Sequence, residues 1–189
     1  MPRRERSGAN MDLMPAQLLV DHWSVFESES LRGPILDLAC GDGHNGIFMA
    51  TKGLPVICCD ISEQALSRVK ELAAETRVVV ETWHVDLEAA EMNPLPENFY
   101  EGILVFRYLH RPLIPCIKKA LKKGGVLIYE TFTIEQPKFG KPQNPKFLLK
   151  PGELLEWFEN WEIVYAFEGV KEGPKRAVAQ VVCRKPKRI

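Results

Sequence analysis

The sequence has no excess of charge of either sign. Its 189 residues contain 25 Lys plus Arg and 25 Asp plus Glu, so the formal net charge at pH 7 is zero. A neutral chain has no overall field that would attract a nucleic acid or an anionic membrane. The basic clusters lie at the two ends, at residues 2–6 and 184–188. We therefore expect neither nucleic acid nor membrane as a partner.

Long apolar runs and paired cysteine motifs are also missing. No stretch approaches the roughly 18 apolar residues that span a bilayer, and the first residues lack the compact apolar segment of a secretory signal. The five cysteines form no CxxC pair and have no histidines at zinc spacing; they are Cys40, Cys58, Cys59, Cys116 and Cys183. The sequence predicts reduced thiols, no metal site and a cytoplasmic location.

What the sequence does contain is enough apolar material for one core. Hydrophobic residues make up 46% of the chain, and the length suits one catalytic domain rather than two. Residues 1–11 are polar and show no period, which predicts a flexible lead. We expect a single domain over residues 12–185 and a basic tail over residues 186–189.

Strand-like and helix-like segments alternate along most of the chain. Short apolar runs alternate with amphipathic segments, a pattern typical of a doubly wound parallel sheet covered by helices on both faces. The last two runs are separated by glycine and proline, which predicts an antiparallel hairpin. The fold class is therefore α/β, with a mostly parallel seven-stranded sheet. Strands are expected at 35–39, 56–59, 78–85, 103–106, 126–130, 162–167 and 177–183, and helices at 18–26, 45–52, 62–74, 113–122 and 151–158.

The alternation lapses between residues 132 and 150. This stretch is rich in proline, lysine and glycine and is longer than most connections in compact domains. Loops of this length often cover a binding site, so we expect a lid here, from which Glu135, Gln136, Phe139 or Lys141 could select a substrate.

A glycine-rich turn follows the first predicted strand. Gly41, Gly43 and Gly46 satisfy the spacing GxGxxG, and Asp60 closes the next strand 19 residues after Gly41. Glycines let the backbone approach a ligand at the carboxyl ends of the strands, and an acid at the position of Asp60 can accept the hydroxyl protons of a ribose. A nicotinamide dinucleotide is one candidate. Asp37 argues against it, because a buried carboxylate repels a pyrophosphate and attracts an ammonium group.

The ordered motifs resemble those of class I S-adenosylmethionine (SAM)-dependent methyltransferases, whose cofactor has a ribose and an ammonium group but no phosphate. The resemblance spans roughly residues 33–131 and implies a Rossmann-like fold. Residues 107–113 and 127–132 are similar to small bacterial members of the tellurite-resistance type. The matching motifs are Asp37-x-Ala39-x-Gly41-x-Gly43, Asp60, Val85-Asp86-Leu87 and Lys123-Gly124-Gly125. Ala39 departs from the family, because many members have glycine there.

The resemblance also implies roles for single residues. Gly41, Gly43 and Ala39 would line the methionine end of SAM, and Asp37 would help to hold its ammonium group. Asp60 would bind the ribose and Ile61 would pack on adenine. Three further residues complete the implied set: Asp86 and the Leu87 amide at the edge of adenine, and Phe106 near the sulfonium.

Methyl transfer needs alignment more than acid–base chemistry, because the sulfonium is already activated. His110 is the candidate base, and Arg107 could attract an anionic acceptor. We expect a small-molecule methyl acceptor and a monomer or homodimer. Two alternatives remain open: a NAD-dependent reductase that uses the GxGxxG loop, and a non-catalytic SAM-binding regulator.

Overall fold

Seven strands pair into one sheet in the order β3-β2-β1-β4-β5-β7-β6. The computed structural model describes residues 14–27, 33–89 and 94–187. The strands are β1 (Ile35–Leu38), β2 (Val56–Asp60), β3 (Glu81–His84), β4 (Tyr100–Phe106), β5 (Leu121–Phe132), β6 (Glu162–Lys171) and β7 (Arg176–Arg184).

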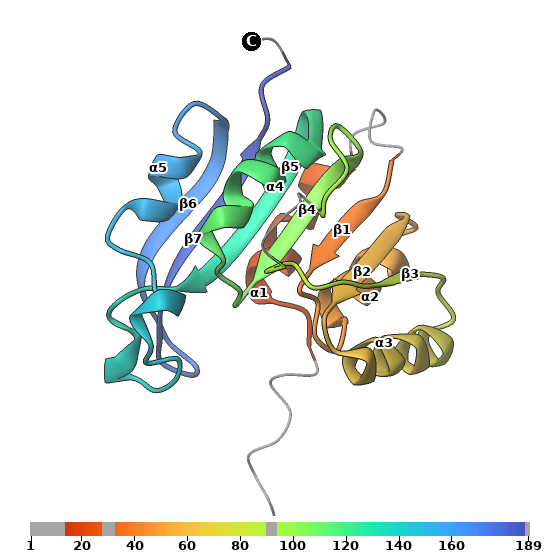
Figure 1. The fold of residues 1–189 in the computed structure, drawn as a ribbon, viewed down its shortest axis with the longest axis horizontal. Helices are drawn as coiled ribbons and strands as arrows, with labels where there is room; N and C mark the ends of the chain where they lie inside the picture. The colour runs from red at the N-terminus through yellow and green to blue at the C-terminus, as the bar shows by residue number, and fades with distance from the viewer. Residues whose placement is uncertain (1–13, 28–32, 90–93, 188–189) are drawn as a thin grey trace, which may run out of the picture.

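The direction of the strands divides the sheet into two parts. Strands β1 to β5 run parallel to one another, and β7 is antiparallel to both β5 and β6 (Figure 1). The predicted fold class is thereby confirmed, including the C-terminal hairpin. All five parallel strands end at the lower edge in Figure 1, which is where open α/β sheets bind their ligands.

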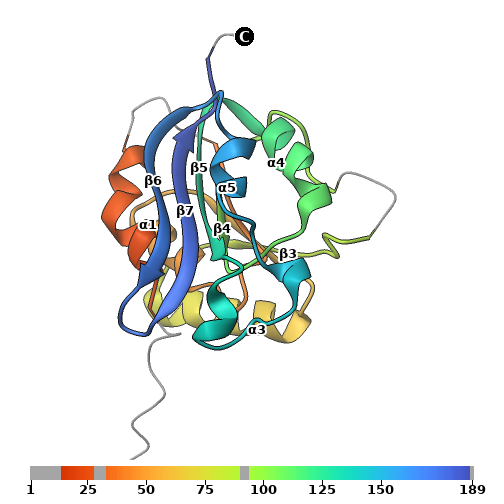
Figure 2. The same ribbon diagram turned by 90° about the vertical axis from the view of Figure 1, so that its left-hand side faces the viewer.

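Helices cover both faces of this sheet. Figure 2 shows α1 on one side and α4 with α5 on the other. None of the helices in the described part of the chain is long and apolar enough to cross a membrane. The α-helices are α1 (Gln17–His22), α2 (His44–Thr51), α3 (Glu63–Thr76), α4 (Ile114–Ala120) and α5 (Glu153–Trp157), and the 3-10 helices are η1 (Trp23–Phe26), η2 (Arg111–Leu113), η3 (Gln136–Lys138) and η4 (Pro145–Phe147).

Alternation along β1 separates two hydrophobic clusters. Leu36 and Leu38 pack on the side of α4 and α5, whereas Ile35 packs with α1, α2 and α3. Asp37 belongs by alternation to the same face as Ile35, so a carboxyl group enters an otherwise apolar layer. That position makes Asp37 the one buried acid of β1.

Three expectations about the elements need correction. The predicted helix over 113–122 is too long, because α4 ends at Ala120 and Leu121 is already extended and buried in β5. Strand β3 is shorter than predicted, and Val79 before it is 91% exposed. Strand β6 continues through Gly169, so the hairpin turn lies later than expected. The expected lead over 1–11 and the end of the expected tail lie outside the described residues.

The stretch predicted as a lid is fastened to the rest of the chain near both ends. At one end the buried Gln136 side chain accepts a hydrogen bond from the Ala177 amide (2.8 Å) and donates one to the Lys141 carbonyl (2.9 Å). At the other end the Arg111 guanidinium donates to the carbonyls of Lys146 and Leu148 and forms an ion pair with Glu153. Gln136 and Arg111 thus have structural partners.

Substitution of Gly46 tests how closely α2 packs on the sheet. A Cβ at this position would lie 2.5 Å from Cys58 Sγ and 3.0 Å from Asp37 Oδ2. We expect Gly46→Ala to lower the free energy of unfolding by about 1–3 kcal/mol, measured by denaturant titration. In a Cys58→Ala background the sulfur is gone, so the loss should be smaller. An equal loss in both backgrounds would show that this contact does not limit the packing.

Candidate functional site

The loop between β1 and α2 has a left-handed backbone at three positions. The φ angles are 52° at Ala39, 53° at Gly41 and 78° at Gly43. This conformation is free of steric cost for glycine but costs about 1–2 kcal/mol for a residue with a Cβ. Ala39, the departure from the family pattern, therefore carries the strain that a glycine would avoid.

The glycines of this loop meet different surroundings. A Cβ on Gly43 would lie 2.6 Å from Val69 Cγ2 of α3, so this glycine allows α2 and α3 to pack together. A Cβ on Gly41 would meet no atom within 4 Å. The backbone of Gly41 is thus left open to a ligand.

A buried carboxyl group lies directly beneath this loop. Asp37 is 1% exposed, and its Oδ2 accepts a hydrogen bond from the Gly46 amide (2.8 Å). Burial, opposed by this hydrogen bond, raises the pKa of Asp37 to about 7, and the nearby charge of Asp60 adds to the rise. Asp37 is therefore a group whose charge can change near neutral pH and respond to a cation above it.

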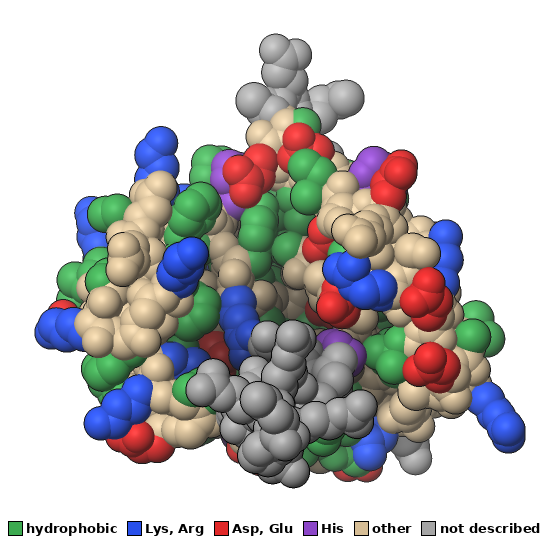
Figure 3. All heavy atoms as spheres, turned by 90° about the horizontal axis from the view of Figure 1, so that it is seen from below, with side chains coloured by type: hydrophobic (Ala, Val, Ile, Leu, Met, Phe, Trp, Pro, Cys, Tyr) green, Lys and Arg blue, Asp and Glu red, His purple; other side chains and the backbone are tan. Residues whose placement is uncertain are grey.

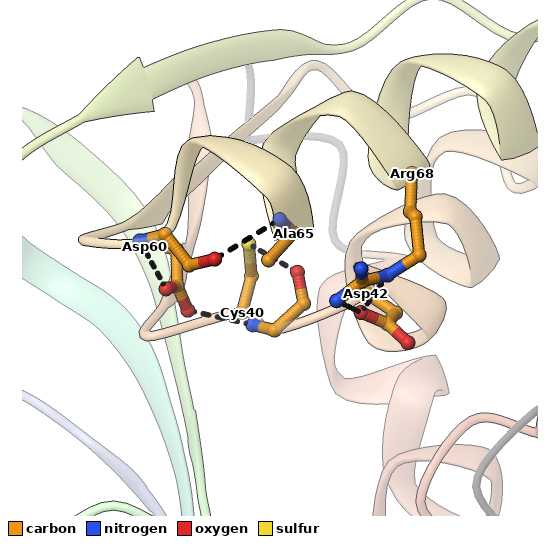
Figure 4. Close-up of polar contacts among 7 residues, drawn as sticks. Cys40, Asp42, Asp60, Ala65 and Arg68 are labelled. Atoms are coloured by element: carbon orange, nitrogen blue, oxygen red, sulfur yellow. Dashed lines mark hydrogen bonds and ion pairs between the residues drawn. The ribbon is translucent and has the colours of Figure 1, made fainter.

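Asp60 connects the glycine loop to the start of α3 (Figure 4). Its Oδ2 accepts a hydrogen bond from the Gly41 amide and its Oδ1 one from the Ser62 amide, both at 2.9 Å. Ser62 in turn caps α3 through its side chain and the Ala65 amide (3.2 Å). Asp60 thus has a structural role, yet each of its oxygens keeps a further lone pair for a ligand hydroxyl.

A second carboxylate of the loop faces away from this arrangement. Asp42 pairs with Arg68 of α3 at 2.6 Å, and both side chains are more than two-fifths exposed (Figure 4). This pair ties the loop to α3 at the surface, where ion pairs contribute little to stability.

A cavity of about 440 Å³ opens beside the loop. Three carboxylates line it, and Ile61 offers it an apolar side chain that is 62% exposed. Acidic walls suit hydroxyl and cationic groups and repel a pyrophosphate, which disfavours the dinucleotide alternative. The lining residues are Ala39, Asp60, Ile61, Val85, Asp86, Leu87, Glu88 and Tyr108.

A polar atom near the loop is buried without a hydrogen-bond partner in the described residues. It is the His44 Nε2 atom, in the first turn of α2. Leaving such a group unpaired costs about 1–3 kcal/mol. Together with the open space over Gly41, this atom fits a ligand that carries polar groups along the edge of the sheet, as SAM does.

A second cavity, of about 600 Å³, lies between the chain that follows β4 and the lid. It shares Tyr108 and Glu88 with the first cavity, so the two are neighbours. Figure 3, which views this edge from below, shows hydrophobic side chains at its centre and charged ones around them. The lining residues are Glu88, Arg107, Tyr108, Leu109, Phe132, Lys141, Pro142, Gln143, Asn144 and Phe147.

The structure brings most of the sequence-predicted cofactor residues together. Five of the nine line the smaller cavity, and Gly41 is bonded to one of these, Asp60. Asp37 lies beneath the loop and Gly43 packs on α3. Phe106 ends β4 and packs against the cluster on the α1 side, so it borders neither cavity.

The two candidate catalytic residues are placed differently. Arg107 lines the larger cavity and follows β4 with a left-handed φ of 56°. His110 lines neither cavity, and its Nδ1 lies 3.8 Å from Glu88 Oε2. His110 can therefore reach the larger cavity only through Glu88.

Sequence reasoning missed Glu88, which borders both cavities. The Glu88 amide donates a hydrogen bond to Asp86 Oδ1 (2.9 Å) within the turn that follows β3. An acid two residues after Asp86, at the end of a strand, is the signal that would have found it. Among the described residues, no group of three or more His, Cys, Asp or Glu is placed to hold a metal ion.

Comparison with known proteins shows similarity to methyltransferases. A family described as "Methyltransferase domain" matches residues 35–125. "Probable S-adenosyl-L-methionine-dependent methyltransferase TehB" of Haemophilus influenzae is 27% identical over 161 residues, which cover 80% of this chain and 54% of that protein. "tRNA 5-carboxymethoxyuridine methyltransferase" of Escherichia coli is 29% identical over 99 residues, which cover 49% of this chain and 38% of the relative.

A solved structure shows the same fold. The crystal structure of TehB from Haemophilus influenzae superposes with a TM-score of 0.73 at 21% sequence identity, covering 88% of this chain and 62% of that one. The chain spans about half the length of the TehB sequence it matches.

Substitution of Asp60 tests the smaller cavity. We expect Asp60→Asn to weaken the binding of S-adenosylhomocysteine about 10- to 100-fold in calorimetry, because hydrogen bonds to the charged carboxylate are lost. Asp42→Asn is the matched control, since it removes a carboxylate of the neighbouring glycine loop that lies outside the cavity. Equal affinities of Asp60→Asn and the wild type would mean that the ribose is not bound here.

The raised pKa of Asp37 gives a pH dependence with a definite sign. The neutral carboxyl stabilises the fold fully below its unfolded pKa of about 4, and this contribution is lost as pH rises through about 7. Between pH 5 and pH 8 the unfolding free energy of the wild type should therefore fall relative to Asp37→Asn, by up to about 3 kcal/mol. Denaturant titrations at several pH values measure this difference. If the unfolding free energies of the two proteins change equally with pH, the raised pKa of Asp37 is refuted.

Proposed function

Because the chain resembles the class I SAM-dependent methyltransferases of the TehB type, we propose that it transfers a methyl group from SAM to a small-molecule acceptor. The observation that carries the proposal is the pair of adjoining cavities that share Tyr108 and Glu88. One cavity is acidic and lies beside the glycine loop. The other is lined in part by the lid and, at about 600 Å³, has the size of a small-molecule site.

The residues of the smaller cavity would hold the nucleoside part of SAM. Asp60 would accept hydrogen bonds from the ribose hydroxyls through the lone pairs that its two backbone contacts leave unused. Ile61 would pack on adenine, whose edge would meet Asp86 and the Leu87 amide. Tyr108 would close the cavity opposite these residues.

The glycine loop would hold the methionine part. Gly41 and Gly43 would let the backbone come close, with Ala39 beside them. Asp37, in its ionised form, would attract the ammonium group from beneath the loop without contacting it. Phe106, at the end of β4, would lie near the sulfonium.

The protein's part in the reaction is chiefly alignment and exclusion of water. When bound, SAM supplies an activated methyl group, whose bond to sulfur breaks as the acceptor atom bonds to the methyl carbon. Arg107 would orient the acceptor in the larger cavity. If the acceptor carries a proton, Glu88 would take it and pass it to His110, because His110 itself does not border the cavity.

We favour a small molecule over a nucleic acid as the acceptor. One relative is named for action on tRNA. This chain, however, has no net charge, and the larger cavity is lined by only two basic side chains, Arg107 and Lys141. A cytoplasmic location and a monomeric or homodimeric state belong to the same proposal; the five cysteines are all unpaired, as reduced thiols would be.

The test combines binding with transfer. S-adenosylhomocysteine should bind in calorimetry, and labelled SAM should methylate at least one member of a panel of small thiols, phenols, carboxylates and amines, with bulk tRNA as a further arm. Asp60→Asn should lose both readouts together, because the same residue holds the cofactor.

Other outcomes point elsewhere. Methylation of tRNA alone would replace the small acceptor with a nucleic acid. Binding without product across the panel would indicate a regulator. NADH fluorescence enhancement without S-adenosylhomocysteine binding would indicate a reductase.

A further inference from the structure

The larger cavity has walls that suit a flat ring. Tyr108 and Leu109 come from the chain after β4, Phe132 from the end of β5, and Pro142 and Phe147 from the lid. Three of these five side chains are aromatic. Phe147 is 46% exposed, so a ring that covered it would remove apolar surface from water.

The charges around this cavity are unevenly distributed. Arg107 and Lys141 supply two positive charges against the single carboxylate of Glu88. Glu88 lies on the wall shared with the cofactor cavity and faces His110. The side chains that line the larger cavity and not the smaller one therefore carry positive charge.

Lys141 is a lid lysine without an acidic partner, unlike Lys138, which pairs with Glu135. Within the described ranges no carboxylate pairs with Lys141, although it lines the cavity. A charged ligand group is the partner that this ammonium lacks.

The Tyr108 hydroxyl adds a polar group to the wall between the two cavities. Burial, followed by the negative charge of Glu88 and a hydrogen bond to that carboxylate, raises the pKa of Tyr108, so the hydroxyl stays protonated at neutral pH. A donor at this wall suits an oxygen or sulfur acceptor.

We propose that the larger cavity binds an aromatic acid, a ring that carries an ionised oxygen or sulfur group, as the methyl acceptor. This inference rests on the proposed function and names its substrate class. The ring packs between Phe132, Phe147 and Pro142, and Lys141 with Arg107 selects the negative charge.

An ionised acceptor also explains the position of His110. The anionic heteroatom bonds to the methyl carbon while the carbon–sulfur bond of SAM breaks. The sulfonium becomes a neutral thioether and the anion becomes a neutral methyl ester, ether or thioether. No proton is transferred, so the reaction needs no base at the cavity. The positive charge of the sulfonium and the negative charge of the acceptor are both neutralised in this step.

The experiment measures binding to the protein saturated with S-adenosylhomocysteine, by calorimetry, with three probes of one shape: benzoate, benzamide and benzylamine. We expect benzoate to bind at least about tenfold more tightly than the other two, as one charge-assisted contact predicts. Acetate, which has the charge without the ring, should bind more weakly than benzoate. Transfer from labelled SAM to thiosalicylate and 4-hydroxybenzoate is the second readout.

Single substitutions test separately how the lysine charge and the aromatic wall contribute to binding. Lys141→Gln should abolish the preference for benzoate over benzamide, and Lys141→Arg should restore it. Phe147→Ala should weaken benzoate and benzamide alike. Lys138→Gln is the matched control, because it removes a lid lysine that pairs with Glu135 outside the cavity, and it should change neither affinity.

Several results would overturn the inference. Equal binding of benzoate and benzamide, equal binding of acetate and benzoate, or an unchanged preference in Lys141→Gln would each do so. If S-adenosylhomocysteine binds but no aromatic probe binds at millimolar concentration, the acceptor class is wrong while the methyltransferase assignment stands. If S-adenosylhomocysteine itself does not bind, the proposed function fails first.

Discussion

The hydrogen bond between the buried Asp37 carboxyl and the Gly46 amide is the contact on which the ligand-binding edge depends. It fixes the first turn of α2 against β1, at a point where only a hydrogen atom fits between Gly46 and the Cys58 sulfur. Once α2 is held there, the preceding loop must turn back through three left-handed residues. Those turns bring the Gly41 amide to Asp60 and leave open space above Gly41. A carboxyl group that is costly to bury therefore organises the whole edge.

Much of this arrangement could be predicted from the sequence, because its causes are local. Short apolar runs located the strands, and the joint spacing of Asp37, the glycines and Asp60 located the loop. Leu121 escaped prediction because a buried leucine fits a helix end and a strand start equally well, and its pairing with Tyr100 decided between them. The partners of Gln136 and Arg111 were also beyond reach, since they lie 41 and 42 residues away along the chain. Long-range contacts of this kind carry no local pattern.

The two cavities divide opposite charges between them, with Tyr108 at the boundary. Asp60 and Asp86 face the side that would hold a cationic cofactor, whereas Arg107 and Lys141 face the side that would hold an acceptor. In a low-dielectric cleft, such separation favours each ligand in its own place and opposes exchange of the two. Glu88 stands at the junction, where its carboxylate can balance charge on either side.

The two sets of contacts that hold the ends of the lid have an evolutionary consequence. Gln136 secures one end to β7, and Arg111, which pairs with Glu153 of α5, holds the other through its bonds to the carbonyls of Lys146 and Leu148. The lid residues that line the larger cavity lie mostly between these two contacts. A segment held at both ends can exchange its middle without disturbing the sheet or the glycine loop. Residues 141–144 thus form a replaceable insert, through which related enzymes could diverge in substrate while keeping one cofactor site.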